Sequence, residues 1–102
     1  MHLKDKIVQL IIEFVMNHGH TTGEKLEKEL AIFETNLRKD VKWYLTRDEY
    51  KKEVEETIKQ VDKNLESSLK SIPLDDPSFL KKLHNILRRA QNFAHLYVSL
   101  SR

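Results

Sequence analysis

The chain reads LEKELAIFETNLRKDVKWYL over residues 26–45, and this stretch determines which helical architecture the sequence predicts. One interpretation bends the chain at residues 31–33, so that one helix covers residues 22–30 and the next covers residues 34–45. The alternative is a single helix over residues 24–45. It is favoured by the absence of glycine and proline after residue 24 and by one continuous apolar face, made of Leu26, Leu30, Phe33, Leu37, Val41 and Tyr44.

With the bend, the helix at residues 34–45 exposes a polar and basic surface and buries Ile32. Asparagine, arginine and lysine side chains donate hydrogen bonds to base edges in the major groove, and hydroxyl and basic side chains hold phosphates. We therefore expect base edges and phosphates to be contacted by Thr35, Asn36, Arg38 and Lys39. We expect the DNA backbone to be held by Thr21, Thr22, Lys42 and Arg47.

The same stretch ends in two adjacent aromatic residues, Trp43 and Tyr44. Adjacent side chains on a helix point about 100° apart. We therefore expect one of the two to lie in the core and the other to make a packing or dimer contact.

A wider pattern surrounds this helix. It consists of a helix that ends in Asn17, His18 and Gly19, a threonine-capped helix with Glu24, Leu26 and Leu30, a turn at Ala31 and Ile32, and the run Leu37, Arg38, Lys39, Asp40, Val41. On these features, residues 11–45 resemble the N-terminal helix-turn-helix of DeoR-type repressors and related bacterial and archaeal regulators. The resemblance implies a tri-helical unit that lays its third helix in the DNA major groove. Phe33 stands where that family has a capping serine, and a new helix at Thr46 replaces the β-wing, so a wingless form is implied.

The remaining segments also predict helices joined by short turns. Apolar residues at helical spacing predict a first helix over residues 3–18, with Gly19 in a left-handed cap. The second half predicts a helix that extends to about residue 71 and a final helix after it, and heptad spacing in both indicates an antiparallel hairpin over residues 46–102. The starts of the later helices are marked by Thr21 with Glu24, Thr46 with Glu49, and Asp76 with Pro77.

The final helix carries more apolar surface than one antiparallel neighbour covers. We therefore expect it to meet the first helix or a second subunit, which makes a homodimer the expected state. Residues 77–102 contain five basic residues and no acidic one, so this helix either pairs with acidic residues of the segment 53–66 or presents a basic strip to phosphate. The candidate interface residues are Phe79, Leu83, Ile86, Phe93, Tyr97 and Leu100.

Composition limits the classes of function. A chain of 102 residues is long enough for one domain with its own core, and the absence of cysteine excludes disulfides and thiolate zinc sites. The longest apolar run, residues 7–16, is too short to span a bilayer, so we expect a cytoplasmic protein with no membrane partner. The sequence has no catalytic motif and no metal-ligand cluster, and we expect no enzymatic activity, no cofactor and no metal.

The sequence therefore predicts an all-α single domain over residues 1–102, with a helix-turn-helix part at 1–45 and a helical hairpin that forms the dimer at 46–102. The first functional hypothesis is a small dimeric regulator of transcription that reads double-stranded DNA with the helix at 34–45. The unbroken helix leads to a second hypothesis: a four-helix bundle that serves as a protein–protein interaction module. An adaptor, an inhibitor or immunity-type protein, or an assembly subunit belongs to this class, and none of them needs a nucleic-acid role.

Overall fold

The computed structural model describes residues 2–100, and every regular element in that range is a helix. The all-α prediction is therefore confirmed. The first helix has the predicted bounds, and the two long helices α2 and α6 account for almost half of the described chain. In order, the elements are α1 (Leu3–His18), α2 (Gly23–Leu45), α3 (Asp48–Lys51), α4 (Val54–Lys63), α5 (Leu65–Leu69) and α6 (Phe79–Leu100).

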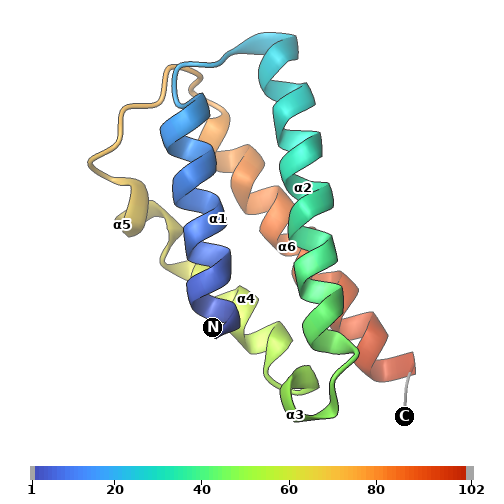
Figure 1. The fold of residues 1–102 in the computed structure, drawn as a ribbon. Coiled ribbons are helices and arrows are strands. Elements are labelled where there is room, and N and C mark those ends of the chain that lie inside the picture. Colours follow the sequence, from blue (N-terminus) through green and yellow to red (C-terminus); the bar gives the residue numbers. More distant parts are fainter. Residues whose placement is uncertain (1, 101–102) are drawn as a thin grey trace.

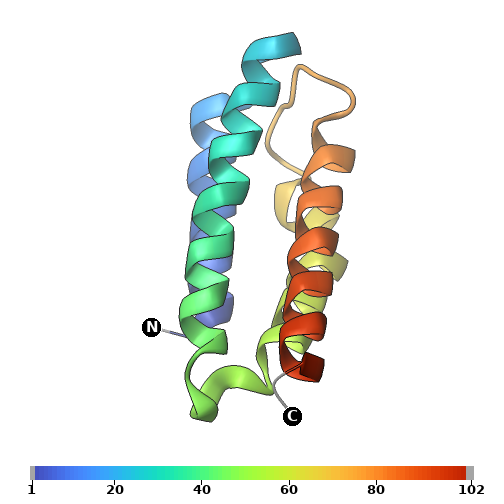
Figure 2. The ribbon, with the colours of Figure 1, turned by 90° about the vertical axis from the view of Figure 1, so that its right-hand side faces the viewer.

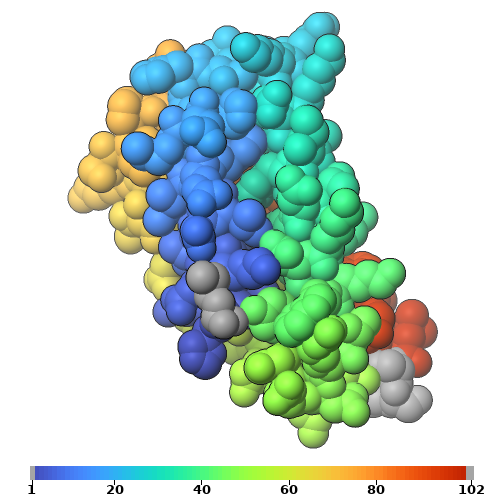
Figure 3. Space-filling model, viewed as in Figure 1, coloured from blue at the N-terminus to red at the C-terminus, as the bar shows by residue number. Residues whose placement is uncertain are grey.

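Two antiparallel helix pairs pack face to face as a four-helix bundle (Figures 1 and 2). The first pair is α1 with α2, and these two helices lie side by side over much of the face in Figure 3. The second pair is α4, continued by α5, with α6. Across the two layers α6 packs against α2 and runs in the same direction, while α1 packs against α4.

The predicted bend at residues 31–33 is wrong, because α2 continues through it without interruption. Phe33 is only 4% exposed and extends the apolar face between Leu30 and Leu37, while Ile32 is 55% exposed. An unbroken helix buries the larger phenylalanine at the expense of the isoleucine, and no glycine or proline opposes it. The four-helix bundle is thus the architecture that the described residues adopt.

The helix predicted from residue 46 to 71 is also wrong, since this segment forms three helices. Thr46 ends α2: its backbone N–H bonds to the Lys42 carbonyl, and its hydroxyl donates to the Trp43 carbonyl at 2.8 Å. Arg47 then adopts extended dihedrals, with φ −112° and ψ 119°, and turns the chain into the short α3. Threonine satisfies the end of the preceding helix here and does not start the next one.

The connection between α1 and α2 differs from the prediction in its backbone. Gly19 has right-handed dihedrals, and the positive φ of 63° occurs at Gly23. The predicted capping box of Thr21 with Glu24 does not form, because Thr22 precedes α2 without a side-chain capping bond and the Thr21 hydroxyl lies against His18. Gly19 allows a close approach: an added Cβ would lie 3.0 Å from the Pro73 carbonyl oxygen, where the loop before α6 crosses the end of α1.

A single apolar core joins both layers, which supports one domain over the described residues. The Phe14 ring of α1 lies 4.9 Å from the ring of Phe33 in α2 and 5.7 Å from that of Phe79 in α6, measured between centroids. Three of the predicted interface residues, Phe79, Leu83 and Ile86, are buried in this core and do not form part of a surface. No helix within residues 2–100 combines the length and apolar character needed to cross a lipid bilayer.

Candidate functional site

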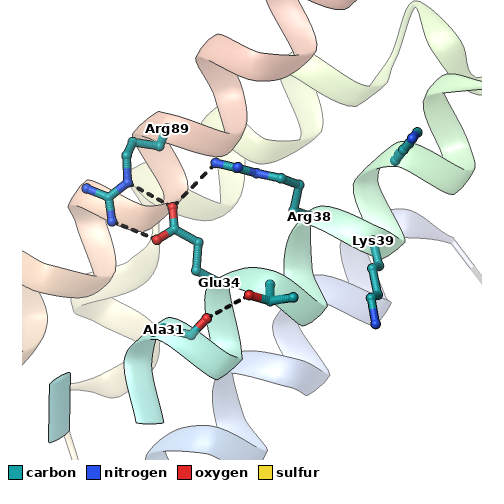
Figure 4. A pocket seen from close by; sticks show the side chains of 7 residues that line it. Ala31, Glu34, Arg38, Lys39 and Arg89 are labelled. Atoms are coloured by element: carbon teal, nitrogen blue, oxygen red, sulfur yellow. Dashed lines mark hydrogen bonds and ion pairs between the residues drawn. The ribbon is translucent and has the colours of Figure 1, made fainter. Parts of the chain in front are cut away.

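An open hollow of about 640 Å³ lies along α2 where α6 packs beside it, and four basic side chains surround it. Figure 4 shows Arg38 of α2 and Arg89 of α6 pointing to the carboxylate of Glu34, while Lys39 of α2 extends away from it. We call this feature the basic hollow. Its lining consists of Ala31, Glu34, Thr35, Arg38, Lys39, Lys42 and Arg89.

Helical spacing explains why these residues meet. Residues three, four and seven positions apart share one side of a helix, and the α2 residues of the lining follow these steps from 31 to 42. Five of the six α2 residues, from Glu34 to Lys42, lie after residues 31–33, so a helix over residues 34–45 would group them as well. The unbroken α2 adds Ala31 to the row.

Glu34 holds the two arginines of the hollow in place. Arg89 Nε donates to Oε2 at 2.8 Å and Arg89 Nη2 donates to Oε1 at 3.0 Å, while Arg38 Nη2 lies 3.7 Å from Oε2. The hydrogen bonds from Arg89 lower the pKa of the Glu34 carboxyl, although partial burial acts in the opposite direction, and the same bonds raise the pKa of Arg89. Glu34 therefore fixes the position of Arg89 and draws Arg38 to the same carboxylate.

Four cations against one carboxylate leave the hollow with an excess of positive charge. Within residues 2–100, the side-chain ammonium groups of Lys39 and Lys42 have no hydrogen-bond or ion-pair partner. The Thr35 hydroxyl donates to the Ala31 carbonyl at 3.0 Å, within the helix. The hollow can therefore offer two ammonium groups and the outer N–H groups of two guanidinium groups to an anionic ligand.

A second ion pair fixes α6 against α2. Lys82 on α6 bonds to Glu27 on α2, and this bond raises the pKa of Lys82. The Arg38 guanidinium also lies 5.7 Å from the centroid of the Phe93 ring. Polar and aromatic contacts thus connect the two helices along the hollow.

The structure brings together half of the residues predicted to bind DNA. Four of the eight line the basic hollow: Thr35, Arg38, Lys39 and Lys42. Asn36 is exposed outside it, and Thr21 and Thr22 lie at the opposite end of α2. Thr21 Oγ1 lies 3.4 Å from His18 Nδ1.

Arg47 has a local structural role at the end of α2. Its guanidinium stacks 3.5 Å from the centroid of the Trp43 ring, and Nη1 donates to the Trp43 carbonyl at 3.1 Å and to Thr46 Oγ1 at 3.2 Å. Arg47 thereby satisfies a terminal carbonyl group of α2 and covers one face of the indole.

Sequence reasoning missed Arg89 as a site residue. The final helix has an excess of basic residues, and this excess predicted either a partner among the acidic residues of segment 53–66 or a basic strip for phosphate. Arg89 instead pairs with Glu34 of α2, because α6 lies between α2 and α4.

Four histidines each face a carboxylate from another part of the fold. His84 Nδ1 lies 2.5 Å from Asp62 Oδ1, and the other pairs are His18 with Glu29, His20 with Asp75 and His95 with Glu55. Among the described residues no group of three or more histidine, aspartate or glutamate side chains is arranged to hold a metal ion. The histidines therefore serve as contacts between elements.

Comparison of the chain with protein-family models, with curated proteins and with solved structures finds no match in any of the three. The geometry of the basic hollow and its surroundings is accordingly the basis for a proposal about function.

Proposed function

We propose that the protein is a helical-bundle interaction module that binds an acidic segment of a partner protein in the basic hollow. The observation that carries this proposal is the ratio of four cations to one carboxylate in an open hollow whose two helices are joined by ion pairs. Charge of one sign concentrated in a concave surface attracts the opposite sign.

The partner's carboxylates would meet two kinds of donor. Lys39 and Lys42 supply mobile ammonium groups, and Arg38 supplies a planar fork that matches a carboxylate. Glu34 already orients Arg38 and Arg89, so their side chains lose less freedom on binding. Each exposed ion pair contributes roughly 0 to 1 kcal/mol, so we expect weak, salt-sensitive binding.

A protein partner is favoured over DNA by the surroundings of the hollow. A helix that enters a major groove about 12 Å wide should protrude from the protein. α2 does not protrude, because α1 and α6 flank it. Acidic residues of α2, including Glu27 and Asp40, lie on either side of the basic row. The net charge of only +2 adds little attraction for phosphates. The DNA-reading hypothesis stays a prediction, and the test below separates it from ours.

The test uses the ¹⁵N-labelled protein and a 12-residue peptide of alternating Glu and Ala, with the Gln/Ala peptide and a 12-base-pair duplex as competitors. We expect the Glu peptide to shift the amide signals of residues 34–42 and of Arg89, and the double variant Lys39→Glu, Lys42→Glu to abolish the shifts. The matched control is Lys59→Glu with Lys63→Glu, two exposed lysines of α4.

Two results would overturn the proposal. One is equal binding of the Glu and Gln peptides. The other is tighter binding of the duplex than of the Glu peptide through the same residues, with loss of affinity in the Lys39→Glu, Lys42→Glu variant. The second result would restore the DNA-reading hypothesis on a bundle scaffold.

A further inference from the structure

Two large apolar side chains stand exposed on α2 beside the basic hollow. Ile32 is 55% exposed and Trp43 is 48% exposed. They are eleven residues apart, which is about three helical turns or roughly 16.5 Å. Lys39 lies between them on the same side of α2, seven residues after Ile32 and four before Trp43.

The indole of Trp43 is held in position by its neighbours. The Arg47 guanidinium covers one face at 3.5 Å from the ring centroid, and the Tyr44 ring meets the indole edge to face at 4.8 Å between centroids. A side chain that is already fixed loses little entropy when a partner covers it. Tryptophan and arginine are also the residues most enriched among those that dominate binding energy in protein interfaces.

Neither side chain belongs to the buried core, although the Trp43 ring contacts the rings of Tyr44 and Tyr50. The buried face of α2 is complete without them, and Tyr44 rather than Trp43 enters the core at this level. A single exposed apolar residue is ordinary. Ile32 and Trp43, however, share one side of α2 with the basic residues of the hollow. That side is therefore both charged and apolar, and an amphipathic ligand can contact both kinds of residue.

We infer that the occupant of this surface is an acidic amphipathic helix of a partner protein. This inference rests on the proposed function and extends it. The helix lies along α2, with carboxylates directed to the basic hollow and with two apolar residues about eleven positions apart that cover Ile32 and Trp43. An amphipathic helix laid against apolar anchors is a common mode of peptide recognition, and the spacing follows because both helices rise by about 1.5 Å per residue.

The experiment compares three 16-residue peptides of high helix propensity. The first has glutamates on one side and leucines at positions 3 and 14. The second replaces both leucines with glutamine, and the third keeps the leucines and replaces the glutamates with glutamine. Affinity is measured by fluorescence anisotropy of labelled peptides, and the emission of Trp43, the one tryptophan in the chain, reports its own burial.

We expect the first peptide to bind about tenfold more tightly than the second, because each leucine gains buried apolar area. The first peptide alone should shift the Trp43 emission to shorter wavelength. Ile32→Ser removes one of the two apolar anchors, so it should reduce the affinity of the first peptide by about threefold and leave the affinity of the second peptide unchanged. The matched control is Ile12→Ser on α1, another exposed isoleucine.

The outcomes separate this inference from the proposed function. Equal affinity of the first two peptides, with no effect of Ile32→Ser, overturns the amphipathic helix and leaves acidic binding in place. Equal losses from Ile32→Ser and Ile12→Ser overturn it as well. Failure of both Glu-containing peptides to bind overturns the proposed function itself.

Discussion

The guanidinium of Arg89 donates two hydrogen bonds, of 2.8 and 3.0 Å, to the carboxylate of Glu34, and so joins α6 to α2 across 55 residues of sequence. The pair closes one side of the basic hollow and leaves the outer edge of Arg89 exposed. Fold and candidate site therefore depend on the same contact.

Replacement of Glu34 by glutamine should affect stability and binding in opposite directions. The variant loses a charge-assisted bidentate pair, which we expect to cost roughly 0.5 to 1.5 kcal/mol because Arg89 is half exposed. It also removes the one carboxylate of the hollow, and the removal of this repulsion should outweigh the loss of arginine orientation, so an acidic peptide should bind more tightly. Urea unfolding and peptide titration measure the two effects. Glu66→Gln, at an exposed position of α5, is the control and should change neither.

The stability of the Glu34 contact should depend on pH. Arg89 lowers the pKa of Glu34 in the folded protein, so the contact contributes fully above the ordinary value of 4.5 and is lost as the pH falls through the lower folded value. The difference in free energy of unfolding between the wild type and Glu34→Gln should therefore be largest near pH 7 and shrink below about pH 4. A difference that stays constant from pH 7 to pH 3 would contradict the ion pair.

Adjacent alanine substitutions test the continuity of α2. Phe33→Ala removes a buried ring and should cost about 3 to 5 kcal/mol, whereas Ile32→Ala should cost less than about 1 kcal/mol. A bent helix reverses this order, because it buries Ile32. Thermal and urea unfolding of the two variants distinguish the two architectures directly.

Arg47→Ala should free the indole of Trp43. The guanidinium stacks on the ring and bonds to the carbonyl of the same residue, so its loss removes a cation–π contact worth about 0.5 to 1 kcal/mol at an exposed site and a capping bond. We expect the tryptophan emission to move to longer wavelength and acrylamide quenching to increase. Arg47→Lys keeps a cation but lacks the planar fork, and it should restore the emission only in part. Unchanged quenching in Arg47→Ala would show that the stack does not persist in solution.

Sequence periodicity predicted the helical class, the bounds of the first helix and the apolar face of α2, because each depends on residues close together in the chain. The choice at residues 31–33 depended on competition between Ile32 and Phe33 for the core. Partners in other helices decide that competition: Phe33 meets Phe14 of α1, a contact across nineteen residues. Local patterns cannot rank such contacts.

The sequence also predicted part of the candidate site, namely its residues on α2. Helical spacing alone grouped Thr35, Arg38, Lys39 and Lys42 on one side of a helix, and they do line one hollow. Arg89 could not be assigned from local sequence, since its position follows from the packing of α6 on α2. One of Trp43 and Tyr44 was expected in the core and the other at a packing or dimer contact. The structure buries Tyr44 and places the Arg47 guanidinium on the Trp43 ring.

The ion pairs Glu27–Lys82 and Glu34–Arg89 have the same offset of 55 residues, so both oppose the same motion, the sliding of α6 along α2. A slip of one turn, about 5.4 Å, would break both at once. The two helices consequently hold one register, because a displacement large enough to break one ion pair also breaks the other. Lys82 lies two turns before Arg89 on α6. A substitution at Lys82 would therefore change the position of Arg89 at the hollow by loosening the register of the two helices.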